Sequence, residues 1–111
     1  MKHIAPEKFL ELLELLEQPE TLKGIQIVDV REPYEWDYYH LDEPELIPMN
    51  TIPERLDELA GDADLYVVCA HGVRSEMVCG YLERNGFDPD KLVNVEGGMA
   101  ALAMLRGFAY D

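Results

Sequence analysis

The chain has 111 residues, of which 48% are hydrophobic, and this is enough apolar material to form one compact domain over residues 1–111. Its formal net charge of −14 disfavours nucleic acids and anionic membranes as partners. The sequence contains neither the hydrophobic region of a signal peptide nor eighteen consecutive apolar residues. We therefore expect a cytoplasmic protein that does not cross a membrane.

The first elements of the chain are a short strand and an acidic helix. Residues 2–5 are compatible with a strand, and Pro6 is well placed to begin a helix that runs over residues 7–17. Three carboxylates share one stripe of this helix: Glu7, Glu11 and Glu14. The simplest interpretation of this stripe is a solvated face rather than a metal site.

Turn residues then punctuate a strand, a short helix and a second strand. Residues 18–20 and Gly24 interrupt the helical pattern before the apolar run of residues 25–30, which predicts a strand. Residues 33–39 favour a short helix or turn, and residues 46–48 favour a brief strand. This part of the chain therefore alternates strands and helices.

The second half of the chain continues that alternation. A helix is predicted over residues 52–59 and a turn over residues 61–64. Strands are predicted over residues 65–68 and 92–95, and a final helix over residues 99–106. Gly97 and Gly98 lead into the final helix. Strands separated by helices imply an α/β fold, with a mostly parallel sheet of about five strands and helices on both faces.

Cys69 lies where the strand of residues 65–68 meets a loop that contains a glycine. Beyond this loop a helix is predicted to begin near Ser75 and to end near residues 85–86. The apolar residues that recur at helical spacing are Met77, Val78, Tyr81 and Leu82. The unpaired N–H groups and the positive dipole end of such a helix favour an anion, including a thiolate. The sequence therefore predicts a reactive cysteine, and the alternative is a core cysteine that closes a strand.

Several short motifs, in the right order, resemble the rhodanese family of single-domain sulfurtransferases over nearly the whole chain. These motifs are the Asp-Val-Arg-Glu-Pro block at residues 29–33, Trp36, and residues 40–41, 46–48, 53–59, 69–75 and 96–98. The resemblance implies a rhodanese-like fold of three layers, α/β in class. It also implies that residues 69–75 form the active-site loop.

The spacing between cysteine and arginine in this loop distinguishes two chemistries. Arg74 lies five residues after Cys69, and Ser75 occupies the sixth position. Cysteine phosphatases and their rhodanese-fold relatives place the arginine six residues after the cysteine, so that a larger ring of amides surrounds a phosphate. By this resemblance, the smaller loop favours a sulfane sulfur carried on the cysteine over a phosphoryl group.

The resemblance implies a persulfide mechanism centred on Cys69. Its thiolate attacks the outer sulfur of thiosulfate or a related donor, and passes that sulfur to cyanide in vitro or to a thiol or protein in the cell. The anionic sulfur is bound by the N–H groups of the loop, which belong to Ala70, His71, Gly72, Val73, Arg74 and Ser75. Neither a metal nor an organic cofactor is expected.

Two arginines have alternative roles. Arg74 either holds an oxyanion of the donor or turns inward to pair with a carboxylate such as Asp29. Asp29 and Arg31 follow a predicted strand, so they lie near Cys69 if the two strands are neighbours. The resemblance implies that this pair supports the loop, and the simpler interpretation is an ordinary salt bridge. A substrate contact by Arg31 is a third alternative.

Other residues near the loop also have two interpretations. His71 either assists sulfur transfer near neutral pH or is an exposed residue that adds mild positive potential. Gly72 supplies a backbone conformation that a Cβ atom disfavours, and His40 is expected to pack or cap locally. Cys79 either resolves an oxidised Cys69 or is a structural thiol, and we favour the structural thiol. The two cysteines give no disulfide framework, which suits a reducing cytosol.

The surroundings of the loop are acidic and aromatic. Residues 42–45 form an acidic segment where the family usually has a small turn, and this favours a thiol or protein partner over a small anion. Trp36 and the tyrosines at positions 34, 38 and 39 either line the site or pack at its rim. The favoured function is a sulfurtransferase or persulfide carrier. The alternatives are a binding or redox-sensing module and, less favoured, a cysteine phosphatase.

Overall fold

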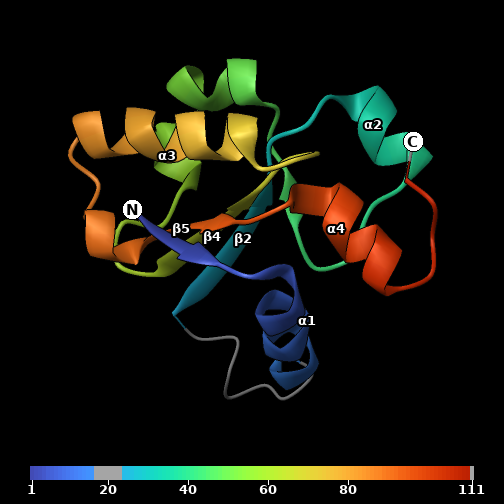
Figure 1. The fold of residues 1–111 in the computed structure, drawn as a ribbon. Coiled ribbons are helices and arrows are strands. Elements are labelled where there is room, and N and C mark those ends of the chain that lie inside the picture. The colour runs from blue at the N-terminus through green and yellow to red at the C-terminus, as the bar shows by residue number, and fades with distance from the viewer. Residues whose placement is uncertain (17–23, 111) are drawn as a thin grey trace.

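The computed structural model describes residues 1–16 and 24–110, and its centre is a parallel β-sheet (Figure 1). The strands lie in the order β1-β5-β4-β2-β3, and every neighbouring pair is parallel. Their bounds are β1 (Lys2–Ile4), β2 (Ile25–Asp29), β3 (Glu45–Leu46), β4 (Asp64–Val68) and β5 (Leu92–Val95). The predicted α/β fold with a mostly parallel sheet of about five strands is confirmed.

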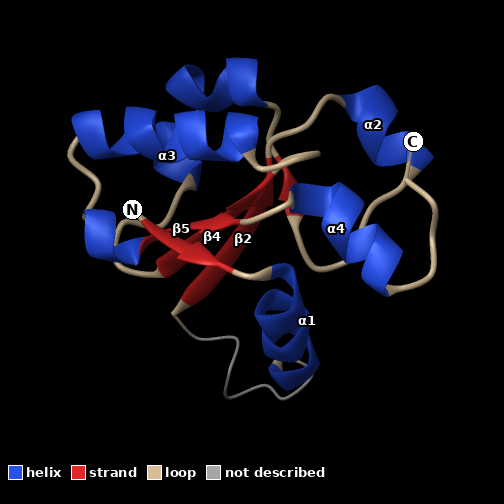
Figure 2. Cartoon of the chain, in the orientation of Figure 1, coloured by secondary structure: helices blue, strands red, loops and turns tan. Residues whose placement is uncertain are grey.

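Helices cover both faces of this sheet, as the sequence predicts (Figure 2). One face is covered by α1 (Pro6–Leu15) and α4 (Gly98–Leu105), and the other by α3 (Val73–Arg84). The short helix α2 (Pro33–Tyr38) follows the end of β2 and lies on the same side of the molecule as α4 (Figure 1). Within residues 1–16 and 24–110, no helix is both long and apolar enough to cross a membrane.

The central strands bury side chains on both faces of the sheet. Val28 and Val67 belong to the apolar cluster beneath α3, whereas their chain neighbours Ile27 and Val68 belong to the cluster beneath α1 and α4. Because side chains alternate along a strand, both clusters draw on the same short segments. Burial on two faces explains why these strands are almost continuously apolar in the sequence.

The predicted helix over residues 52–59 is wrong. The segment forms two short 3-10 helices, η2 (Met49–Glu54) and η3 (Leu56–Glu58), which are separated at Arg55. Pro53 lies inside η2 and has no N–H group to donate, and Arg55 leaves the helical region with φ −125° and ψ 24°. Short 3-10 turns therefore replace a regular α-helix.

Smaller differences concern the ends of elements. Helix α3 begins at Val73 rather than near Ser75, because Gly72 serves as its N-cap. Strand β3 ends before the predicted residues 47–48. The carboxylate stripe on α1 is exposed, which confirms the solvated face. The predicted turn at residues 18–20 and the last predicted residue of the first helix, Glu17, lie outside the described residues.

Candidate active site

Cys69 lies at the carboxyl edge of the sheet, directly after β4. The neighbouring strand β2 ends beside it, since Asp29 is in register with Val68 and the Val30 N–H donates to the Val68 carbonyl over 2.9 Å. Cys69 is only 1% exposed. The ends of β2 and β4 therefore meet, as predicted for neighbouring strands. They meet at the edge where open α/β sheets bind ligands.

Gly72 shapes the loop that receives the cysteine sulfur. It adopts φ 94°, in the left-handed region, and its N–H donates to Cys69 Sγ over 3.0 Å. A Cβ atom at this position would also lie 3.3 Å from the Gly97 nitrogen. The predicted special backbone conformation of Gly72 is thus confirmed, and it turns one N–H group of the helix start onto the sulfur.

Helix α4 holds the opposite side of the same loop. The Met99 N–H donates to the Cys69 carbonyl over 2.7 Å, and the Ala100 N–H donates to the Ala70 carbonyl over 2.9 Å. Gly98 makes this approach possible, because a Cβ atom there would lie 2.5 Å from the Cys69 carbonyl oxygen. The loop carbonyls are therefore turned toward α4.

A buried hydroxyl also contacts the sulfur. Ser75 Oγ lies 3.3 Å from Cys69 Sγ and donates to Asn94 Oδ1 on β5. Ser75 is 0% exposed and Asn94 is 3% exposed. The Asn94 amide nitrogen lies 3.2 Å from His3 Nδ1 on β1. The cysteine is thereby linked through two buried polar side chains to a histidine at the surface.

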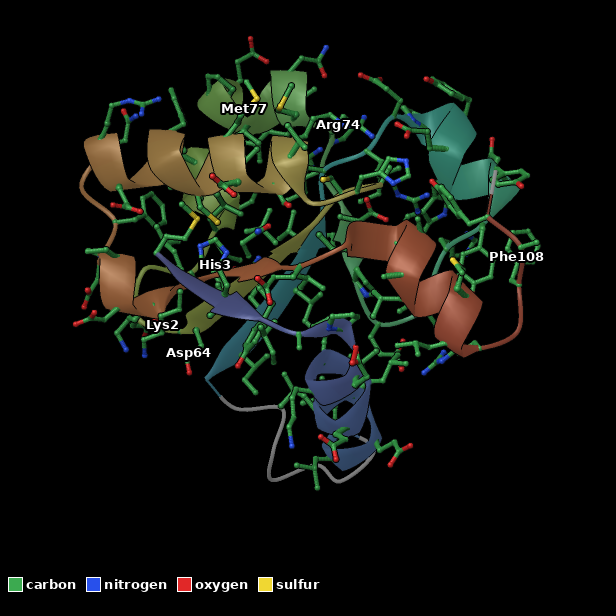
Figure 3. All side chains as sticks on the ribbon, viewed as in Figure 1. Lys2, His3, Asp64, Arg74, Met77 and Phe108 are labelled. Atoms are coloured by element: carbon green, nitrogen blue, oxygen red, sulfur yellow. The ribbon has the colours of Figure 1, made fainter. Side chains whose placement is uncertain are left out.

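Arg74 pairs with a carboxylate on α2. Its Nη1 and Nη2 atoms each lie 2.8 Å from an oxygen of Glu35, and Figure 3 shows Arg74 at the end of α3 that faces α2. These hydrogen bonds lower the pKa of Glu35, and the pKa of Arg74 is raised by the same contact. Of the two predicted roles, the structure shows the inward pairing, but with Glu35 instead of Asp29.

Asp29 is not accessible to Arg74 because Arg31 occupies it. Arg31 is 0% exposed, and its N–H groups donate to the Asp29 carboxylate, to the carbonyls of Glu35 and Tyr39, and to the Tyr110 hydroxyl. Burial alone would lower the pKa of Arg31, but the hydrogen bonds and charge of Asp29 raise it overall. All five N–H groups of this guanidinium are used, so a substrate contact by Arg31 is wrong.

The other loop residues differ in exposure. His71 is exposed, and the edge of its ring meets Tyr110 at a centroid distance of 6.2 Å. Val73 is 67% exposed, whereas Ala70 is 5% exposed. His71 therefore lies at the outer rim of the loop, next to Tyr110.

Aromatic side chains pack at this rim. The Tyr39 ring stacks on Phe108 at 4.5 Å, while Tyr34 is 73% exposed. His40 stacks on Trp36 at 4.1 Å, and its Nδ1 lies 2.8 Å from the Trp36 carbonyl, which confirms its predicted local packing. Packing at the rim therefore accounts for most of these rings.

Cys79 is buried in the interior of α3. It belongs to the apolar cluster beneath that helix, and burial raises its pKa to about 12. A thiol in such surroundings is neutral at physiological pH and does not act as a nucleophile. The favoured interpretation of Cys79 as a structural thiol agrees with this environment.

Four residues of the site were not predicted from the sequence. Glu35 carries a local signal, because Glu32 and Glu35 have the three-residue spacing of a capping box. Asn94 is the polar member of an otherwise apolar strand, and a polar residue in that position needs a buried partner. His3 and Tyr110 lie near the two ends of the chain, and nothing in their local sequence connects them to the loop.

Comparison with known proteins agrees with this geometry. The family of the rhodanese-like domain matches residues 9–104. The chain is 39% identical over 87 residues to the putative sulfurtransferase YtwF of Bacillus subtilis, and the match covers 78% of this chain and 82% of that protein. It is 34% identical over 98 residues to the thiosulfate sulfurtransferase GlpE of Shewanella oneidensis, with 85% and 90% of the two chains covered.

A solved structure is similar as well. The rhodanese-like domain protein from Staphylococcus aureus superimposes with a TM-score of 0.76 at 44% sequence identity, and the match covers 92% of this chain and 91% of that one. Residues 9–104, which the rhodanese-like domain family matches, contain every strand from β2 to β5, the loop at Cys69 and most of α4. The chain belongs to the rhodanese-like domain family.

Proposed function

We propose that this protein is a sulfurtransferase that carries a sulfane sulfur as a persulfide on Cys69. The observation that carries the proposal is the position of Cys69 Sγ. It lies at the N-terminus of α3 and accepts the Gly72 N–H over 3.0 Å. Helix α4 meanwhile binds the loop carbonyls of Cys69 and Ala70. Two carbonyl dipoles of the loop are thus held by α4, and the Gly72 N–H points toward the sulfur.

The first half of the reaction forms a sulfur–sulfur bond. The Cys69 thiolate attacks the outer sulfur of thiosulfate, the bond between the two thiosulfate sulfurs breaks, and sulfite leaves with the bonding electron pair. The product on the enzyme is a persulfide, whose terminal sulfur is an anion of similar charge to the thiolate. The same N–H groups and helix dipole therefore stabilise both states.

The second half regenerates the thiolate. A thiophilic acceptor attacks the outer sulfur and takes it, while the electrons of the broken sulfur–sulfur bond return to Cys69 Sγ. Cyanide serves as the acceptor in vitro, and a thiol or a protein serves in the cell. Because donor and acceptor react in separate steps, the kinetics are expected to be ping-pong.

The position of Arg74 favours this chemistry over phosphatase chemistry. A transferred phosphoryl group is stabilised by a guanidinium that points at its oxygens. Both terminal nitrogens of Arg74 are instead bound by Glu35, at 2.8 Å each. The acidic residues Asp42, Glu43 and Glu45 are exposed, and we infer that they favour an acceptor that is a thiol or a protein, with thiosulfate as a test donor.

The test is mass spectrometry of the intact protein after treatment with thiosulfate. The wild type is expected to gain the mass of one sulfur atom and to lose it on addition of cyanide, with release of thiocyanate. The matched controls are Cys69→Ser, which is expected to gain nothing, and Cys79→Ser, which is expected to behave as the wild type. A wild type without the added sulfur contradicts the proposal. A persulfide that forms but is not passed on indicates a sensing module instead.

A further inference from the structure

A continuous chain of polar contacts runs from the cysteine sulfur to the surface of the sheet. It begins with Cys69 Sγ and Ser75 Oγ at 3.3 Å, continues from Ser75 Oγ to Asn94 Oδ1, and ends with Asn94 Nδ2 and His3 Nδ1 at 3.2 Å. Figure 3 shows His3 on the side of β1 that faces α3, while Lys2 points to the opposite side. The chain therefore joins α3, β5 and β1.

The positions of the hydrogen atoms determine which atom donates in each of these contacts. The single proton of the Ser75 hydroxyl is donated to Asn94 Oδ1, so Ser75 has only lone pairs to offer to the sulfur. A Cys69 thiol satisfies this arrangement, because its S–H donates to Ser75 Oγ. A Cys69 thiolate does not, since two electron-rich atoms would then face each other at 3.3 Å.

A Cys69 thiolate fits when donor and acceptor exchange roles in every one of these hydrogen bonds. The Ser75 hydroxyl turns its proton to the sulfur, the Asn94 amide rotates so that Nδ2 donates to Ser75 Oγ, and Asn94 Oδ1 then faces His3 Nδ1. That last contact requires a proton on His3 Nδ1, which an imidazolium always provides. One proton leaves Cys69 Sγ for bulk water and one is taken up from water at the exposed His3 Nδ1, so the total number of bound protons is unchanged.

We propose that Asn94 and His3 are positioning residues of the sulfur site, in which protonation of His3 sets the Ser75 hydroxyl toward Cys69 and so favours the thiolate. The proposal rests on the function proposed for Cys69 above. It extends the site from the loop to β1, at the other end of the sequence. His3 acts through Asn94 and Ser75 and does not touch the substrate.

We call the contacts from Cys69 through Ser75 and Asn94 to His3 the relay. Other charged or titratable groups surround His3, and the test must distinguish their effect on Cys69 from that of the relay. Residues 92–95 of β5 carry none. The short helix η4 (Pro89–Lys91) packs on β1, and on α3 the Glu83 carboxylate pairs with the Met1 ammonium at 3.1 Å. Burial raises the pKa of Cys79 to about 12, so this thiol is neutral near pH 6. The groups concerned on these elements are Met1, Lys2, Glu76, Cys79, Glu83, Asp90 and Lys91.

The experiment measures the rate of Cys69 alkylation by iodoacetamide between pH 5.5 and 8, because only the thiolate reacts. His3→Leu, whose side chain cannot donate a hydrogen bond to Asn94, is expected to slow the reaction about fivefold near pH 6 and to leave it unchanged near pH 8. Lys2→Gln, which removes a cation from the opposite side of β1, is the matched control and is expected to react like the wild type.

The double variant decides whether the relay carries the effect. In a Ser75→Ala background, His3→Leu is expected to change nothing, since the hydroxyl that transmits its effect is gone. If Ser75→Ala does not fold, Asn94→Leu interrupts the hydrogen bonds at the next residue and serves the same purpose. Equal rates for His3→Leu and the wild type at pH 6 overturn the proposal, as does a fivefold loss that persists without Ser75.

Alkylation also separates this proposal from the proposed function. It reports the thiolate directly and needs no sulfur donor. A His3-dependent alkylation rate without persulfide formation contradicts the sulfurtransferase proposal alone. A persulfide that forms equally in wild type and His3→Leu at pH 6, together with equal alkylation rates, contradicts only the proposed role of His3.

Discussion

The two cysteines of this protein are equally buried but have different hydrogen-bonding surroundings. Cys69 and Cys79 are 1% and 0% exposed, and both belong to the apolar cluster beneath α3. Cys69 accepts an N–H from Gly72 at the start of the helix, whereas Cys79 lies within the helix, where backbone N–H groups are already bonded. The comparison teaches that equal burial leaves two cysteines with different hydrogen-bond donors, and this difference is the basis on which we propose Cys69 as the sulfur carrier.

The largest expected difference between the two cysteines is in alkylation of the native protein. With a pKa of about 12, only about one Cys79 side chain in a hundred thousand is ionised at pH 7. This is about a thousandfold below an ordinary exposed cysteine. Peptide mapping after brief iodoacetamide treatment is expected to find label on Cys69 alone, and on both residues after unfolding in urea. Label on Cys79 in the native protein would contradict the expected difference in reactivity between the two cysteines.

The next effect concerns the buried pair of Asp29 and Arg31. Asp29→Ala leaves the Arg31 charge buried without its partner, and is expected to lower the free energy of unfolding by about 3–5 kcal/mol. Urea denaturation measures this loss. Glu11→Ala, which removes an exposed pair with Lys8, is the control and is expected to leave the midpoint almost unchanged. Equal losses in both variants would show that burial of the pair is unimportant.

A substitution at the contact between α4 and the loop is expected to affect Cys69 and spare Cys79. Gly98→Ala places a Cβ atom 2.5 Å from the Cys69 carbonyl oxygen at φ 59°. Gly86→Ala is the matched control, because Gly86 has φ 93° with open space around it. We expect Gly98→Ala to be less stable than the control by about 1–3 kcal/mol, and to slow alkylation of Cys69. Indistinguishable thermal melting of the two variants would argue against a close contact there.

The smallest effect is expected from the pair between Glu35 and Arg74. Because the pKa of Glu35 is lowered, its contribution to stability is present above its usual range near pH 4.5 and disappears as the pH falls through the lowered value. Glu35→Gln is expected to cost up to about 1 kcal/mol at pH 7, since solvent screens this partly exposed pair. Urea denaturation of both proteins should show a difference in stability that shrinks as the pH falls below that range. A gap of constant size from pH 7 to pH 3 would exclude the ion pair as its cause.

Most of the fold is predictable because it depends on local patterns. The apolar runs of β2, β4 and β5 and the turn residues between them fix the order of strands and helices. The failure at residues 52–59 is also local, since Pro53 is expected at the start of a helix and lies instead inside the 3-10 helix η2. Gly72 was predictable for the same reason, because a tight entry into a helix needs a residue that tolerates a positive φ.

The partners in the site depend on contacts between distant parts of the chain. Arg74 and Glu35 are 39 positions apart, and the sequence cannot decide between Glu35 and Asp29 as the partner of that arginine. The decision follows from Arg31, which folds back onto Asp29 two residues earlier and occupies it. Competition among several carboxylates and arginines at one sheet edge is settled by geometry, which no motif contains.

The sequence by itself determined that a cysteine lies at the junction of a strand and a helix N-terminus, because both elements are encoded by adjacent residues. Only the tertiary structure decided what surrounds that cysteine. Parallel pairing of β1 with β5 brings His3 to Asn94, 91 positions away, and packing of α3 on β5 brings Asn94 to Ser75. Side chains from three elements form one series of polar contacts that ends at the sulfur, because a parallel sheet aligns strands that are far apart in the chain.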